Sequence, residues 1–396
     1  MKLLLATPIL PHPPRTGSTL MAHHWIKHLA QRHSIDLFSF ARERAPELGD
    51  LTRWCQRIET VCLPRWKSRL GKSLGSLSNL PPLVSYYQSV EMLNKVRRAL
   101  EGNVYDVALF QLTHMLQFRP AGYAGVTFAC LEDLQTLHLQ RSLPSCPWYG
   151  RAWQRINMTR MKRYEMSHAK QFDRVLLTAE ADAAEHRSLL GHAKLDWIPH
   201  GVDTEAFCPS ENVLREKGMI VITGNMFHPP NVDGVDFFCR DIFPRICQHV
   251  PDASLWLVGD RPAKSVRKWG QNPKIRITGF VPDICPYLRR AMVSVCPVRL
   301  KIGTQTKVLE AMACGTPVVT TSAGNHGVAA TSGEHLQVVD DPALFADRVV
   351  DLLNAAKWEM FSRQGRQYVV RNFSWEKSAA KLEKLMEQVL ADKIKQ

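Results

Sequence analysis

Several signatures that place a protein in a class at once are missing from this sequence of 396 residues. Its ten cysteines include no Cys-x-x-Cys pair, so neither a disulfide framework nor a zinc site is indicated, and a reducing cytoplasm is expected. The sequence has no Gly-x-Gly-x-x-Gly and no His-Glu-x-x-His motif, and Trp66 stands where a P-loop ending in Gly71, Lys72 and Ser73 needs its first glycine. Nicotinamide-binding and P-loop proteins are therefore disfavoured.

Long hydrophobic runs are missing as well. No window reaches the roughly 18 to 20 consecutive apolar residues of a transmembrane helix, and the apolar start of the chain ends at Pro11, Pro13 and Pro14. A first buried strand explains that start better than a signal peptide does. The composition, 45% hydrophobic and 22% charged, is that of a soluble globular protein, and the length predicts two domains of about 100 to 200 residues each.

Acidic residues are scarce relative to basic ones, because 51 Lys and Arg against 37 Asp and Glu leave a formal net charge of +14. Residues 1–200 carry 26 basic and 16 acidic residues, a surplus of 10, whereas residues 201–396 carry 25 and 21, a surplus of 4. The basic first half implies an anionic partner. Nucleic acid, an anionic membrane surface and a phosphorylated substrate all fit on charge alone.

Two stretches concentrate this charge, residues 53–72 and 141–170. Each holds six or seven Lys and Arg residues against one acid, with tryptophans between them. Basic segments that carry indole rings suit the headgroup region of an anionic bilayer. An ordinary solvated surface explains them equally well.

Short aliphatic runs alternate with helix-length segments along the whole chain, which is typical of parallel strands covered by helices on both faces. The pattern restarts after a turn-rich segment at residues 199–209, so we expect two doubly wound α/β domains whose ligands bind at the carboxyl ends of the strands, in a cleft between the domains. An amphipathic helix at residues 375–391 closes the chain. The expected strands are residues 2–7, 34–40, 104–110, 126–130, 174–178 and 194–198, then 219–223, 254–258, 275–278, 292–296, 317–321 and 335–339.

The strongest local signal is a loop, helix and strand at residues 303–319, GTQTKVLEAMACGTPVV. Backbone N–H groups at the helix start form an anion site, which Gly303 lets a diphosphate approach closely and to which Lys307 adds a charge. Glu310 lies one turn further on, where its carboxylate can accept hydrogen bonds from two ribose hydroxyls. The alternative is a plain i, i+3 pair between Lys307 and Glu310.

Residues 307–319 resemble the C-terminal motif of family 4 (group 1) glycosyltransferases, whose fold is GT-B. Other segments resemble the family in the expected order: 11–17 (PHPPRTG), 172–182 (FDRVLLTAEAD), 199–203 (PHGVD), 257–260 (LVGD), 279–283 (GFVPD) and 373–376 (FSWE). Residues 224–233, GNMFHPPNVD, resemble the subgroup that builds exopolysaccharide repeat units. The resemblance implies an acceptor-binding domain at 1–198, a linker at 199–215, a nucleotide-sugar-binding domain at 216–372, and a helix at 373–396 that packs back toward the first domain.

The resemblance also implies a donor site, although the sequence departs from the family at two places. The family usually has two glutamates eight positions apart. Glu310 matches the second, whereas Ile302 replaces the first, which normally holds the donor sugar. A usual Arg and Lys pair is absent after residue 223, which leaves Arg299, Lys301 and Lys307 as candidate diphosphate cations. The predicted donor-binding residues are Gly17, Asn231, Val281, Arg299, Gly303, Thr304, Gln305, Thr306, Lys307 and Glu310.

Three residues are predicted to act directly in catalysis: Lys307, Glu310 and His114. His114 follows an expected strand of the first domain, so it should face the cleft, where the family often places a donor-sugar contact. Glu132 and Asp133 follow another strand. One of them could orient an acceptor hydroxyl, or both could be helix N-terminal carboxylates.

These observations and the resemblance predict a cytoplasmic, retaining glycosyltransferase that uses a nucleoside-diphosphate sugar, needs no metal or other cofactor, and acts on a glycan or lipid-diphosphate-linked acceptor. Its basic first half would allow peripheral association with the inner face of an anionic membrane, and no nucleic acid is expected as a partner. Two alternatives stay open. A GT-B nucleotide-sugar epimerase would share the fold and the nucleotide site, and a basic nucleic-acid-binding protein would explain the charge but not the motif at residues 307–319.

Overall fold

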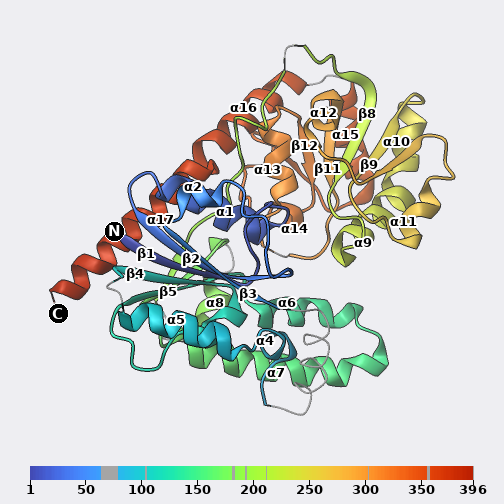
Figure 1. Ribbon diagram of the computed structural model, residues 1–396. Coiled ribbons are helices and arrows are strands. Elements are labelled where there is room, and N and C mark those ends of the chain that lie inside the picture. Colours follow the sequence, from blue (N-terminus) through green and yellow to red (C-terminus); the bar gives the residue numbers. More distant parts are fainter. Residues whose placement is uncertain are drawn as a thin grey trace. The chain divides into compact units, whose positions relative to one another are not determined.

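The computed structural model describes residues 1–63, 79–102, 105–180, 183–191, 194–210, 212–301, 303–354 and 357–395. These residues form two compact units, each a parallel sheet between layers of helices (Figure 1). Unit 1 contains Met1–His200 and Trp375–Gln396, and unit 2 contains Gly201–Ser374. The chain therefore passes from unit 1 to unit 2 after His200 and returns after Ser374. No helix in the described part of the chain is long and apolar enough to cross a membrane.

Unit 1 is built on a seven-stranded parallel sheet with the order β3-β2-β1-β4-β5-β6-β7. Because the chain leaves β1 toward one edge and resumes at β4 toward the other, the β1–β4 pair is the switch point beside which open α/β sheets bind ligands. The strands are β1 (Lys2–Thr7), β2 (Ser34–Ala41), β3 (Arg57–Cys62), β4 (Val107–Gln111), β5 (Val126–Glu132), β6 (Arg174–Leu177) and β7 (Leu195–Trp197).

Helices cover both faces of this sheet, and the strand residues alternate between the two hydrophobic cores. The helices α1 (Gly17–Leu29) and α17 (Trp375–Ile394) lie on one face of the sheet (Figure 1). Leu3 and Leu5 of β1 pack in the core under these two helices, whereas Leu4 and Ala6 pack in the core of the opposite layer. The remaining helices are α2 (Leu51–Trp54), α4 (Pro82–Tyr86), α5 (Val90–Gly102), η1 (Thr113–Phe118), α6 (Gln135–Ser142), η2 (Leu143–Ser145), α7 (Trp148–Ala169) and α8 (Ala183–Leu190). The last helix of the chain is thus part of the core of unit 1.

Unit 2 repeats this plan with a six-stranded parallel sheet, order β10-β9-β8-β11-β12-β13, whose switch point is the β8–β11 pair. The strands are β8 (Glu216–Thr223), β9 (Ser254–Val258), β10 (Ile275–Gly279), β11 (Ala291–Cys296), β12 (Val318–Thr320) and β13 (Gln337–Val338). The helices are α9 (Pro229–Phe237), η4 (Phe238–Ile242), α10 (Phe243–His249), α11 (Lys264–Trp269), α12 (Cys285–Arg290), α13 (Thr306–Ala313), α14 (Ser322–Asn325), α15 (Pro342–Leu353) and α16 (Trp358–Asn372).

The predicted class, two doubly wound parallel α/β domains with a closing helix, is confirmed, although several strand ends shift by a few residues. One strand was not predicted. β3 carries Arg57 and Glu59 between its apolar residues and lies in the first basic stretch. It pairs only with β2 at the edge of the sheet, where polar side chains face water and no apolar run is needed.

Candidate active site

Beside the switch point of unit 2, glycines follow the neighbouring strands β8 and β9 and let the ends of these two strands approach each other. Gly224 and Gly259 end β8 and β9 with φ angles of 140° and 156°, and the Gly224 N–H donates to the Val258 carbonyl at 3.0 Å. A Cβ atom on Gly259 would lie 1.7 Å from the Gly224 oxygen. Only glycine at position 259 allows this approach.

Two predicted donor-site residues meet directly at this point. Lys307 in the first turn of α13 donates from Nζ to Oδ1 of Asn231, and Asn231 in turn donates from Nδ2 to the Asn225 carbonyl at 2.9 Å. A Cβ atom on Gly224 would lie 3.3 Å from Lys307 Nζ and 3.1 Å from Asn231 Nδ2. The ammonium is therefore held beside an exposed loop backbone, and no carboxylate among the described residues forms an ion pair with it.

The start of α13 is the predicted anion site. Gln305 precedes the helix and its side chain makes no capping hydrogen bond to it. Gly303 has a φ of 47°. Its loop lies so close to Gly327 that a Cβ atom on Gly327 would be 2.6 Å from the Gly303 oxygen. Thr304 Oγ1 donates to the Gly327 carbonyl at 3.3 Å, which fixes the loop. Val308 donates its N–H to the Gln305 carbonyl at 2.9 Å, whereas the Gln305 side chain caps none of the earlier N–H groups, so those of Thr306 and Lys307 are the candidates to bind a ligand.

Glu310 lies one turn after Lys307 on α13, half-buried. Burial raises the pKa of its carboxyl group to about 7, and the positive charge of Lys307 partly opposes this rise. The carboxyl group is therefore poised between its two protonation states near neutral pH. A perturbed acid next to an anion site is typical of a functional position.

The other predicted cation, Arg299, is placed differently. Its guanidinium binds both carboxylate oxygens of Asp233 on α9 and lies 4.9 Å from the centre of the Phe237 ring. The hydrogen bonds to Asp233 raise the pKa of Arg299. Because a carboxylate already neutralises this cation, Lys307 is the stronger candidate for a diphosphate.

The remaining predictions of unit 2 concern the base and the donor sugar. Val281 follows β10, is partly buried and packs against the same core as α13, so its backbone stays a candidate contact for a base. Ile302, which replaces the first family glutamate, lies outside the described residues.

His114 does not stand open at its strand end. It lies in η1, is only 6% exposed and stacks on Tyr87 with ring centres 4.1 Å apart. Neither ring nitrogen has a hydrogen-bond partner among the described residues, and burial lowers the pKa of the imidazole to about 3. The ring is therefore neutral and packed, because the chain turns into η1 immediately after β4 and carries His114 inward.

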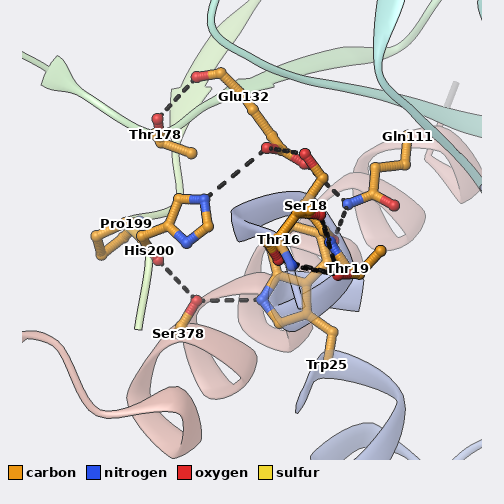
Figure 2. A network of polar contacts seen from close by, with 10 residues as sticks. All are labelled: Thr16, Ser18, Thr19, Trp25, Gln111, Glu132, Thr178, Pro199, His200 and Ser378. Carbon is orange, nitrogen blue, oxygen red and sulfur yellow. Dashed lines mark hydrogen bonds and ion pairs between the residues drawn. The ribbon is translucent and has the colours of Figure 1, made fainter. Parts of the chain in front are cut away.

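The switch point of unit 1 holds a network that the sequence did not reveal (Figure 2). The Glu132 carboxylate, at the end of β5, accepts hydrogen bonds from Ser18 Oγ and Gln111 Nε2, both at 2.8 Å. Gln111 Nε2 also donates to the Ser18 carbonyl at 2.8 Å, and His200 Nε2 lies 3.8 Å from Glu132. These contacts fix the first turn of α1, so Glu132 acts here as a positioning residue instead of a helix cap.

Gly17, the predicted donor-side glycine, is the first residue of α1 in this network. A Cβ atom on it would lie 3.3 Å from Cε1 of His200, so the glycine leaves room for the imidazole. The segment around His200 is fixed in turn, because Ser378 of α17 donates to the Pro199 carbonyl at 2.9 Å and accepts from Trp25 Nε1 at 3.1 Å (Figure 2). Among the residues that the structure describes, no group of three or more His, Cys, Asp or Glu residues is placed to hold a metal ion.

Comparison with known proteins agrees with this geometry. Residues 217–355 match the family model of glycosyl transferases group 1. Unit 2 is a group 1 glycosyl transferase domain. The match includes the glycine pair after β8 and β9, the Lys307–Asn231 contact and Glu310, so the group 1 domain contains most of the predicted donor site.

Two curated relatives each align with about half of this chain. A GDP-mannose-dependent alpha-(1-6)-phosphatidylinositol monomannoside mannosyltransferase of Mycolicibacterium smegmatis is 27% identical over 218 residues, 49% of this chain and 56% of the relative. The lipopolysaccharide core biosynthesis mannosyltransferase LpcC of Rhizobium leguminosarum bv. viciae is 27% identical over 215 residues, 49% of this chain and 60% of the relative. The chain thus matches just over half the length of each relative.

Both units together resemble solved structures. Sucrose-phosphate synthase from Thermosynechococcus elongatus superimposes with a TM-score of 0.75 at 18% identity, over 99% of this chain and 100% of that one. The fold is therefore GT-B, as the resemblance implied.

Sequence reasoning missed Gln111, Ser18 and the pairing of Arg299 with Asp233. The distance along the chain explains the first two, since Gln111 and Ser18 are 93 positions apart and carry no motif. Asp233 and Arg299 are separated by 66 positions. One signal was available, because Gln111 and Glu132 both stand at the end of a predicted strand.

Proposed function

We propose that this protein is a retaining glycosyltransferase that moves a sugar from a nucleoside-diphosphate sugar to a hydroxyl group of a glycan or lipid-linked acceptor, in the synthesis of a cell-surface polysaccharide or exopolysaccharide. The observation that carries the proposal is the meeting of Lys307 with Asn231 and Gly224 beside the uncapped start of α13, inside a group 1 domain. The names of the two curated relatives, a phosphatidylinositol mannoside enzyme and a lipopolysaccharide core enzyme, support a lipid-linked or cell-surface acceptor.

The leaving group explains why such a site accelerates transfer. As the bond from the sugar to the diphosphate breaks, negative charge grows on the phosphate oxygens. Preorganised N–H groups at the start of α13 and the Lys307 ammonium bind that charge more strongly in the transition state than in the ground state. We expect these protein groups to stabilise the leaving diphosphate without a metal ion.

Retention of configuration fits a same-face substitution. The acceptor oxygen attacks the anomeric carbon on the face that the diphosphate leaves, and a leaving phosphate oxygen accepts the acceptor's proton. In this scheme Glu310 accepts hydrogen bonds from the ribose hydroxyls, and the backbone near Val281 contacts the base. Glu310 needs its carboxylate form for this role, which its pKa of about 7 provides for part of the molecules at neutral pH.

The test is the melting temperature of the full chain with a panel of UDP-, GDP-, ADP- and dTDP-sugars, with and without EDTA. A ligand that binds only the folded state stabilises it according to its concentration relative to its dissociation constant. We expect one nucleotide to stabilise the wild type, to do so equally in EDTA, and to lose its effect in Glu310→Ala. Glu359→Ala, an exposed acid on α16 of the same unit, is the matched control and should keep the effect.

Failure of every nucleotide to stabilise the wild type would contradict the proposal. If one nucleotide binds, incubation with that donor alone separates the transferase from an epimerase, because an epimerase produces an isomeric sugar without an acceptor, whereas a transferase produces at most free donor sugar by hydrolysis. Transfer to lipid-linked glycan acceptors is then assayed with the same donor.

A further inference from the structure

Exposed apolar side chains gather on one helix of unit 1. Twelve large hydrophobic side chains of the described residues are exposed, and four of them lie within the first nine residues of α7. The exposed fractions of these residues are 83% for Trp148, 75% for Tyr149, 42% for Trp153 and 48% for Ile156. Tyr149, Trp153 and Ile156 follow one another at i, i+4 and i+7, so they share one face of the helix.

The same helix carries positive charge without exposed negative charge. Residues 146–170 contain six Lys and Arg residues and one acid, Glu165. Glu165 points inward, is 1% exposed, and accepts hydrogen bonds from Thr113 Oγ1 at 3.0 Å and Thr136 Oγ1 at 2.6 Å. The basic residues are Arg151, Arg155, Arg160, Lys162, Arg163 and Lys170. The outer face of α7 is therefore cationic as well as aromatic.

The exposed aromatic residues are not what holds α7 in place. The inner face of the helix provides that attachment through Met161, Tyr164 and Ala169, which are buried, and through Glu165. Large apolar side chains that face water without packing usually mark an interaction surface. In the described part of the first basic stretch, residues 53–63, Trp54 packs against His23 with ring centres 5.0 Å apart and borders the core of unit 1, whereas residues 64–72 with Trp66 lie outside the described residues.

We propose that the outer face of α7, with Trp148, Tyr149, Trp153 and Ile156 surrounded by basic side chains, binds the surface of an anionic lipid bilayer. Indole and phenol rings favour the headgroup boundary, an aliphatic side chain enters the acyl region, and Lys and Arg side chains bind anionic headgroups. Ile156 distinguishes this occupant from nucleic acid, since bases stack on aromatic rings and not on aliphatic side chains. The inference stands on α7 alone and does not depend on the proposed sugar transfer.

The experiment is flotation of the full chain with vesicles of pure phosphatidylcholine or of phosphatidylcholine with one quarter phosphatidylglycerol, at low and high salt. We expect the wild type to bind the anionic vesicles at least tenfold more strongly, and salt to weaken the binding. The triple variant Trp148→Ser, Tyr149→Ser, Trp153→Ser should lose at least tenfold on anionic vesicles. The variant Arg155→Glu, Lys162→Glu, Arg163→Glu should lose the preference for anionic lipid.

Matched controls come from α5 of the same unit. Val90 is 74% exposed and Arg97 and Arg98 are exposed, so Val90→Ser and the pair Arg97→Glu, Arg98→Glu remove similar groups elsewhere. Both should bind as the wild type does, and all variants should keep the wild-type melting temperature because the changed side chains are exposed.

Three outcomes would overturn the proposal. The first is equal binding of the wild type to both kinds of vesicle, and the second is unchanged binding of the aromatic triple variant. The third is that the aromatic face serves another partner, seen as a dimer in light scattering that the triple variant abolishes, or as binding to DNA or RNA but not to vesicles. Stabilisation by nucleotide-sugars is measured separately, so this proposal and the proposed transfer can fail independently.

Discussion

Helix α1 follows β1 and helix α13 follows β11, so each begins beside the switch point of its own unit, but the N-termini of the two helices are capped differently. At α1, Thr16 and Thr19 form a capping box, and Glu132 and Gln111 hold Ser18 from outside the helix. At α13, the Gln305 side chain makes no capping bond and Lys307 occupies the first turn. A capped terminus has already used part of its N–H capacity on its own side chains, whereas an uncapped terminus beside a cation can still bind an anion.

This difference assigns distinct roles to the two units. The start of α1 is rigid and internally satisfied, which suits a wall of a binding site, and the start of α13 is suited to bind a diphosphate. The family comparison follows the same division, since the matched residues 217–355 lie wholly in unit 2.

The largest effect is expected when the cation of α13 is removed. Lys307→Ala takes away a positive charge that acts on the leaving diphosphate, so the transfer rate should fall roughly 100- to 1,000-fold, the usual loss for one transition-state donor. The rate is measured with the donor that the thermal panel identifies. Lys268→Ala, an exposed lysine on α11, is the control. If Lys307→Ala keeps a transfer rate within twofold of the wild type, the start of α13 does not act on the diphosphate through this charge. The two helix starts would then not differ in function.

A change at Glu132 tests the rigid start of α1. Glu132→Ala leaves Ser18 and Gln111 without their shared acceptor, so the free energy of unfolding should fall by about 1 to 3 kcal/mol. Glu132→Gln keeps one acceptor oxygen and should lose less. Urea unfolding measures both, with Glu101→Ala at the exposed end of α5 as the control. Equal stability of Glu132→Ala and the control would show that the network does not fix α1.

The pH dependence of stability tests the environment of Glu310. Its folded pKa of about 7 lies above the ordinary value of 4.5, so the folded state binds more protons between these values and stability falls as pH rises from about 4.5 to 7. Glu310→Gln cannot lose a proton and should gain stability relative to the wild type between pH 5 and pH 8. Urea unfolding at both pH values measures this difference. If the difference in unfolding free energy between Glu310→Gln and the wild type is the same at pH 5 and pH 8, the carboxyl group is not desolvated.

The smallest effect is expected at the cap of α1. Thr16→Ala removes the capping side chain and should lower the free energy of unfolding by about 0.5 to 2 kcal/mol, whereas Thr16→Ser keeps the hydroxyl group and should stay near the wild type. The two variants are compared by urea unfolding at one pH. Similar losses in both would point to the methyl group of Thr16 instead of the cap.

The positions of the strands and of the unit 2 site could be predicted from the sequence because their signals are local. Buried parallel strands are continuous apolar runs, and the loop and helix at residues 303–319 contain both Lys307 and Glu310. The edge strand β3 was not predicted because a half-exposed strand mixes charged and apolar residues and so shows no continuous apolar run.

Local signals could not predict the unit 1 network, the packing of the His114 ring or the ion pair of Arg299. His114 follows its strand as expected, but whether its ring faces out or packs on Tyr87 depends on η1 and α4. Arg299 carries the predicted charge, but a carboxylate 66 positions earlier neutralises it.

The sequence by itself determined that two parallel α/β units follow one another, that one short helix carries both Lys307 and Glu310, and that the first half is basic. Only the tertiary structure decided that Lys307 meets Asn231 while Arg299 meets Asp233, that Glu132 holds the start of α1, and that Trp148 faces water while Trp54 packs inward. The physical reason is that periodicity and motifs report how a residue relates to its neighbours in the chain, whereas burial and pairing depend on side chains brought together by folding.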